Sequence, residues 1–121
     1  MVDIKTLIES AGDDTELAED LLALFNEQAV EGISALADAA QRQDAEQAVA
    51  AAHKLVGSAV ACGFVDLSQT LRRIELQCRS EMPADIEEQI KTVKELMERS
   101  GREMDRLLTD ERNDEKGTYC R

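Results

Sequence analysis

Apolar residues recur along the chain with helical spacing, and this pattern predicts five helices. The first is short, because its apolar positions follow the i, i+3, i+4, i+7 pattern for only two turns. These positions are Ile4, Leu7, Ile8 and Ala11. Asp3 can cap the start of this helix, and Gly12 can end it. We therefore expect a short N-terminal helix that covers one end of a larger helical body.

A second helix is predicted from about Thr15 to about Ala40. Asp13 and Glu16 have the spacing of a capping box at its start. Gly32 interrupts this helix and allows either close packing or a small bend. The inner face is expected to carry Leu17, Leu21, Leu24, Phe25, Gln28 and Leu36.

The third helix is predicted from Ala45 to about Ala61, after a short break that favours an antiparallel neighbour. Asp44 and Gln47 repeat the capping-box spacing. The segment is rich in alanine, which is the best helix former and lets backbones approach closely. Gly63 is well placed for a left-handed cap at the end of the helix.

A fourth helix spans about Phe64 to Ser80, and Pro83 suits the first turn of a fifth. Both carry the apolar seam of a bundle helix. The seam positions are Leu67, Leu71, Ile74 and Cys78, then Ile86, Ile90, Val93, Met97, Met104 and Leu108. The pattern predicts an all-α domain over residues 1–108, an antiparallel up-down four-helix bundle with a short N-terminal helix. Residues 109–121 are charged and aperiodic, so we expect a flexible C-terminal tail.

The composition narrows the class of partner. The 121 residues suffice for one domain, and 26 acidic against 14 basic residues give a net charge of −12. Such a surface repels phosphate backbones and anionic lipid headgroups, so we expect neither nucleic-acid nor membrane binding. The same charge favours a monomer. No membrane span or signal peptide is evident, so a cytoplasmic location is expected.

Cysteine and histidine usage excludes common metal sites. Cys62, Cys78 and Cys120 lack metal-site spacing, and we interpret them as two buried hydrophobes and a tail thiol in a reducing compartment. With His53 as the single histidine, paired-histidine sites are excluded by counting. The sequence thus predicts no metal and no cofactor. Any imidazole chemistry must use His53.

His53 is expected to point outward from the third helix. At about 100° per residue, Ala48, Ala52 and Leu55 define the core direction, and His53 lies nearly opposite to it. Gly57 follows one turn later on the same side, where glycine costs about 1 kcal/mol relative to alanine. That cost is understandable if another molecule must approach the imidazole closely. The alternative is an ordinary solvated histidine.

An exposed imidazole is suited to one reaction in particular. It is mostly neutral at pH 7 and acts as a nucleophile without an activating base. It can accept a phosphoryl group as a phosphoramidate and hand it on. A carrier of this kind needs exposure, a rigid helix and room for the donor, which would supply the metal ion and carboxylates.

The segment AHKLVGSAVACG, residues 52–63, resembles the signature of the histidine-containing phosphotransfer (HPt) domain. The signature is His-x-Leu-Lys-Gly-Ser/Ala with a glycine ten residues after the histidine. The matching positions are His53, Leu55, Gly57, Ser58 and Gly63, followed by Leu67 and Ile74-Glu75. The opening GDDTEL before a long acidic helix is also typical, and the resemblance covers residues 3–108.

The resemblance implies a carrier in two-component phosphorelays. His53 would take a phosphoryl group from a receiver-domain aspartate and pass it to another receiver. The implied partners are receiver domains of response regulators or of hybrid histidine kinases. Members of the family have no kinase activity unless they are joined to a kinase core, so the chain is expected to be a carrier and not an enzyme.

The chain departs from the family at one position. The family usually has lysine three residues after the histidine, where this chain has Val56. Lys54 is basic but lies about 100° round the helix. Glu75 and Arg79 stand at positions that in the family can bond the imidazole and supply a nearby cation. We hypothesise that Glu75 fixes the tautomer of His53, the alternative being a surface i, i+4 ion pair.

The sequence is compatible with two functions. In the first, a receiver docks around Ala50, Lys54, Gly57 and Ala61, with Ser58 adding a polar group, on the face formed by the second and third helices. In the second, the protein is a non-catalytic helical adaptor that binds a response regulator, or itself, without phosphate. The valine at position 56 is the main support for the second.

Overall fold

The computed structural model describes residues 1–119, with side chains through residue 113, and this range is helical without a strand. The helices are α1 (Ile4–Ser10), α2 (Thr15–Gln41), α3 (Ala45–Ala61), α4 (Val65–Ser80) and α5 (Ile86–Tyr119). The predicted all-α class and the number of helices are confirmed. None of these helices is both long and apolar enough to cross a membrane.

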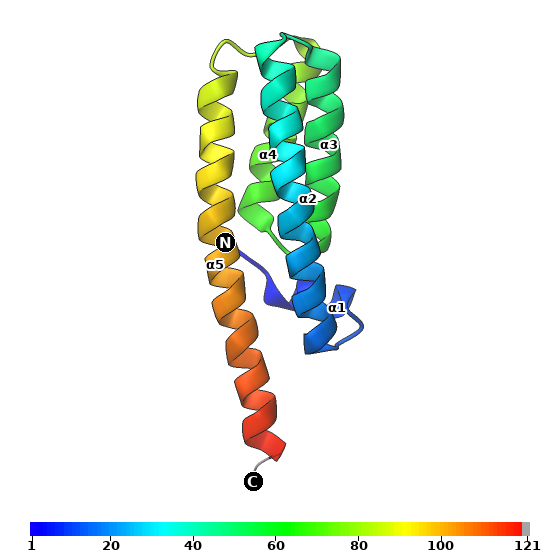
Figure 1. Cartoon of the computed structure of the whole chain (residues 1–121), viewed down its shortest axis with the longest axis vertical. Helices are drawn as coiled ribbons and strands as arrows, with labels where there is room; N and C mark the ends of the chain where they lie inside the picture. Colours follow the sequence, from blue (N-terminus) through cyan, green and yellow to red (C-terminus); the bar gives the residue numbers. More distant parts are fainter. Residues whose placement is uncertain (120–121) are drawn as a thin grey trace.

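The four longer helices lie side by side, and α1 lies at one end (Figure 1). α3 packs against α2 and α4, and α5 packs against the same two helices from the other side. Two seams are therefore opposite one another, one between α3 and α4 and one between α2 and α5. Phe25 and Phe64 stack in the core with their ring centroids 4.7 Å apart. Further buried side chains include Leu7, Leu36, Leu67, Leu71, Ile74, Val93, Met104 and Leu108.

The predicted inner face of α2 is partly wrong. Leu17 and Leu24 are 45% and 48% exposed, and Gln28 is also exposed. The positions that are buried are Ala18, Leu22, Phe25, Ala29, Ile33 and Leu36. α2 carries apolar residues on more than one face, so the pattern alone favoured its larger leucines. The neighbouring helices pack against the face of α2 that carries the alanines, because small side chains let helices approach closely.

Gly32 lies where α2 and α3 approach closely. A Cβ at this position would lie 2.6 Å from Cδ2 of Leu55, which is closer than real contacts allow. Of the two explanations expected for Gly32, close packing is therefore the one that the structure supports. Leu55 itself is buried, so its side chain fills the space that the glycine leaves.

The helix starts agree with the predicted caps at α1 and α3. Asp3 accepts hydrogen bonds from the backbone N–H groups of Lys5 and Thr6, and Asp44 accepts one from Gln47. At α2 the cap is Asp14 and not Asp13, since Asp13 has a φ of 63° in the turn after α1. The carboxylate of Asp14 therefore accepts hydrogen bonds from the first free N–H groups of the helix.

The start and the length of α5 also differ from expectation. Pro83 precedes the helix, where its carbonyl accepts a hydrogen bond from the Ile86 N–H, so it does not occupy the first turn. The helix continues beyond residue 108 to Tyr119, and Arg112 forms an ion pair with Glu19 of α2. The division into a domain over residues 1–108 and a charged, flexible tail over residues 109–121 stays a prediction, and Cys120 lies outside the described residues.

Gly63 joins the N-terminal segment to the turn between α3 and α4. Its φ of +81° confirms the predicted left-handed cap, and its carbonyl accepts a 2.7 Å hydrogen bond from the Asp3 N–H. A Cβ on Gly63 would collide with the Asp3 carbonyl oxygen. Glycine is thus required for two reasons at once, the backbone conformation and the close approach of a second segment.

We predict that Gly63→Ala lowers the free energy of unfolding by about 2 kcal/mol or more, because strain and collision add. Gly12→Ala is the matched control, since Gly12 has a φ of +65° but open space around its Cβ position. That variant is expected to lose only about 1 kcal/mol. Urea denaturation measures both. Equal losses in the two variants would contradict the role of the Asp3 contact.

Candidate functional site

His53 lies in the middle of α3 with its imidazole in solvent. The side chain is 71% exposed, as its place on the helical wheel predicts. α3 is capped by Asp44 and packs closely against both α2 and α4. The imidazole is therefore presented from a rigid support.

One carboxylate oxygen connects His53 to α4. Oε2 of Glu75 lies 2.9 Å from Nδ1 of His53 and 2.7 Å from a guanidinium nitrogen of Arg79. The Glu75 side chain is only 7% exposed, whereas Arg79 is 55% exposed. The i, i+4 pair of Glu75 and Arg79 is thus formed, but its acid is buried and also reaches the histidine. The site consequently lies at the seam of α3 and α4.

The charge of Glu75 follows from its partners. Burial raises the pKa of this carboxyl, but hydrogen bonds from Arg79 and His53, together with their charges, outweigh burial and hold the pKa below its ordinary value. The group is therefore ionised at neutral pH. A buried carboxylate is stable here because both of its neighbours donate to it.

An ionised Glu75 determines which imidazole nitrogen carries a proton. A carboxylate can only accept hydrogen bonds, so Nδ1 of His53 must be the donor in this contact. In the neutral ring, the lone pair then lies on Nε2. Nε2 is therefore the ring nitrogen that can act as a nucleophile.

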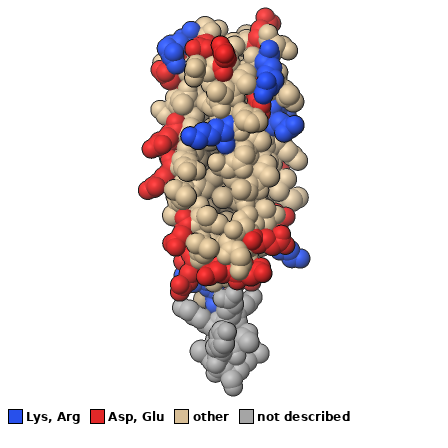
Figure 2. Space-filling view, turned by 90° about the vertical axis from the view of Figure 1, so that its right-hand side faces the viewer, with Lys and Arg blue, Asp and Glu red and all other residues tan. Residues whose placement is uncertain are grey.

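The surface beside His53 is made of small residues. Ala50, Gly57 and Ala61 are exposed and Ser58 is half-buried. A Cβ on Gly57 would meet nothing within 4 Å, so no contact inside the described chain requires a glycine there. Figure 2 shows that the face carrying α3 is largely uncharged, with acidic groups mainly towards its edges. Small side chains therefore surround the exposed imidazole on α3.

The other basic residues that the sequence singled out have a less direct relation to His53. Lys54 and Arg72 are exposed, and no hydrogen bond joins either of them to His53 or Glu75 within the described residues. Val56 is buried, so this position contributes packing and no charge. Arg79 is the cation that the structure connects to the histidine, through the shared oxygen of Glu75.

The surroundings of His53 extend beyond the residues next to it on α3. Its hydrogen-bond partner lies on α4, where the sequence hypothesis placed it at Glu75, and the docking face on the second and third helices stays a prediction. Val60, two turns beyond His53, is 57% exposed and adds an apolar group to the surface of α3. Its helical phase relative to His53 was the signal that could have identified it. Among the described residues, no group of three or more histidine, cysteine or acidic side chains could hold a metal ion.

The family model for the Hpt domain matches residues 20–110, which is most of the chain. No curated protein and no solved structure matches the chain significantly. The chain therefore belongs to the Hpt domain family. Hpt domains function in histidine phosphotransfer within phosphorelays, interact with receiver domains, and are phosphocarriers without kinase activity of their own.

We predict that Glu75→Gln lowers the free energy of unfolding by about 1–3 kcal/mol at pH 7, because a buried charged hydrogen bond is lost. The folded-state pKa of Glu75 lies below its unfolded value, so the stabilisation is present above the ordinary glutamate pKa and is lost as pH falls through the folded value. The difference in the free energy of unfolding between the wild type and the variant should therefore become smaller below about pH 4. Urea titrations from neutral to acidic pH measure it.

Asp38→Asn is the control for this measurement. Asp38 forms an i, i+4 pair with Arg42 in which both side chains are more than half exposed. Exposed pairs of this kind contribute little, so the control should change stability by less than about 0.5 kcal/mol. A similar small change in Glu75→Gln would contradict the buried, ionised state of Glu75.

Proposed function

We propose that His53 accepts a phosphoryl group from the aspartyl phosphate of one receiver domain and passes it to an aspartate of another. The observation that carries this proposal is the exposed imidazole whose Nδ1 is engaged by buried Glu75. That contact leaves Nε2 free and pointing away from its support. The family membership of the chain is consistent with this role.

The transfer requires no base from the protein. The lone pair of Nε2 attacks phosphorus, so a P–N bond forms while the P–O bond to the donor carboxylate breaks and the carboxylate leaves as an anion. Nδ1–H stays hydrogen-bonded to Glu75, whose negative charge stabilises the positive charge that the ring acquires. Attack by a second receiver's carboxylate reverses these steps and restores the neutral imidazole.

Arg79 is the residue that we propose for the positive charge near the phosphoryl group. Val56 occupies the position where the family usually has lysine, and it is buried. Arg79 is about half exposed, so part of its guanidinium group is available to an incoming anion while another part holds Glu75. Lys54 is exposed on the same helix as His53 and can contribute to binding through its long side chain.

The docking surface proposed for the receiver is the outer face of α3, around Ala50, Gly57, Ser58 and Ala61. Small side chains support this choice, because they let the partner's active-site rim approach the imidazole. We infer an up-down arrangement for the four longer helices, since short connections favour antiparallel neighbours. A cytoplasmic location fits the buried, unpaired thiols of Cys62 and Cys78.

The first test is transfer from a phosphorylated receiver domain carrying labelled phosphate. We expect label on the protein that is labile in acid and stable in base, which is the behaviour of a phosphoramidate. His53→Gln should abolish it. Label that persists in His53→Gln would exclude the proposed acceptor. Binding of the receiver without any label on the wild-type protein would favour the adaptor, for which the missing lysine at Val56 is the specific support.

The second test concerns Glu75 as a positioning residue. In Glu75→Ala we expect the ¹⁵N spectrum of His53 to shift from the Nδ1–H tautomer towards the Nε2–H tautomer that is usual for free histidine. The rate of transfer should fall about tenfold. Thermal melting of the variant separates this effect from unfolding. If both the tautomer balance and the rate stay unchanged, Glu75 has only a structural role.

A further inference from the structure

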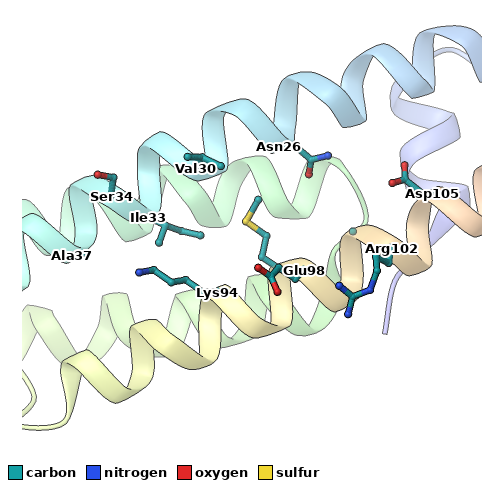
Figure 3. Close-up of a pocket in the computed structure, with 11 residues that line it drawn as sticks. Asn26, Val30, Ile33, Ser34, Ala37, Lys94, Glu98, Arg102 and Asp105 are labelled. Carbon is teal, nitrogen blue, oxygen red and sulfur yellow. The ribbon is translucent and has the colours of Figure 1, made fainter.

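A groove of about 670 Å³ lies between α2 and α5, on the opposite side of the bundle from the seam that holds His53 (Figure 3). Each helix contributes a stripe that spans twelve residues, or about three turns. The α2 stripe is Asn26, Val30, Ile33, Ser34 and Ala37, and the α5 stripe is Lys94, Met97, Glu98, Gly101, Arg102 and Asp105.

The floor of the groove is apolar and partly open to solvent. Ile33 is buried and Met97 is partly buried against the core. Val30, one turn from Ile33, is 65% exposed although it is aliphatic. None of the α2 residues that line the groove is charged, although Glu27 and Glu31 are exposed beside them on the same helix. An uncharged, partly apolar edge beside an open groove suits contact with another protein surface.

The α5 edge carries four exposed charges in alternating order. Along the chain they are Lys94, Glu98, Arg102 and Asp105, with signs plus, minus, plus, minus. None of the four forms an ion pair with another residue among those whose side chains are described. The charges of the groove lining sum to zero, whereas the chain as a whole carries −12. Like-charge repulsion is therefore weak among the lining residues themselves.

The order of charges along α5 is complementary to the same order read in the opposite direction. If a second α5 lies antiparallel to the first, Lys94 faces Asp105 of the second copy and Glu98 faces Arg102 of the second copy. The centre of this pairing lies close to residue 100, next to Gly101, where a Cβ would meet nothing within 4 Å. The missing side chain allows the two backbones to approach.

The two stripes have their centres at the same height. Glu19 of α2 pairs with Arg112 of α5, and this contact fixes the register of the two helices. Counting inward along both helices from that pair, the centre of the α5 charges lies opposite residues 31–32, the middle of the α2 stripe. Figure 3 agrees, with Asn26 near Asp105 at one end and Ala37 near Lys94 at the other. A single two-fold axis can therefore relate both stripes.

We propose that the α2/α5 groove is covered by the same groove of a second copy, in an antiparallel dimer with its two-fold axis near residue 100. In this dimer Val30 packs against the second copy, and four ion pairs form across the axis. The His53 sites of both copies stay exposed, because they lie on the opposite seams. The proposal does not depend on phosphotransfer. The net charge of the chain predicted a monomer. The proposed dimer revises that prediction, because the charges that line the groove sum to zero.

Sedimentation velocity of the full chain, from about 5 to about 500 µM, tests the proposal. We expect reversible formation of a species with twice the 13.4 kDa mass. Glu98→Arg and Arg102→Glu should each weaken the dimer at least about tenfold, since each places like charges opposite one another. The double variant Glu98→Arg/Arg102→Glu should restore it, and an equimolar mixture of the two single variants should form a heterodimer.

Asp110→Arg is the matched control, because it makes the same charge change at an exposed position of α5 that is outside the groove lining and faces away from Glu98. It should leave dimerisation unchanged. Circular dichroism verifies the folding of each variant, and Val30→Asp provides a charge-independent check that is expected to give a monomer. A wild-type protein that stays monomeric at about 500 µM overturns the proposal. So does a dimer that neither single charge variant weakens, or that the double variant does not restore.

Discussion

The candidate site depends on one buried carboxylate. Glu75 is removed from water, and its ionised form is tolerated because Arg79 and His53 both donate to the same oxygen. The carboxylate in turn holds the imidazole in one orientation and one tautomer. Neither role is available to an exposed glutamate, which would exchange its partners for water. The burial of Glu75 therefore links the stability of the seam between α3 and α4 to the chemistry of His53.

The packing of α3 against its neighbours makes this arrangement possible. Gly32 lets Leu55 approach α2, and alanines let α3 and α4 lie close together, so Glu75 on one helix reaches His53 on the other. Gly63 closes the turn between these two helices and receives the N-terminal segment against it. A looser seam would separate the carboxylate from the imidazole by more than a hydrogen-bond distance.

The opposite seam has different physical properties. α5 and α2 leave a groove between them, and its α5 edge alternates in charge although the chain as a whole carries a net charge of −12. This bundle has two separate surfaces, one with the exposed imidazole of His53 and one with a balanced charge pattern. A partner on one surface does not obstruct the other, because the two seams face opposite directions.

The sequence by itself determined the helices and the outward direction of His53, because periodicity, capping residues and helical phase are local properties. It also singled out Glu75 and Arg79, although it left a surface ion pair as an equal alternative. Only the tertiary structure decided that Glu75 is buried, since burial depends on how closely α3 and α4 pack. The same holds for α2, whose leucines at 17 and 24 are exposed because its neighbours pack on the alanine face. Which apolar face is buried is a property of contacts between distant segments, and no local pattern contains it.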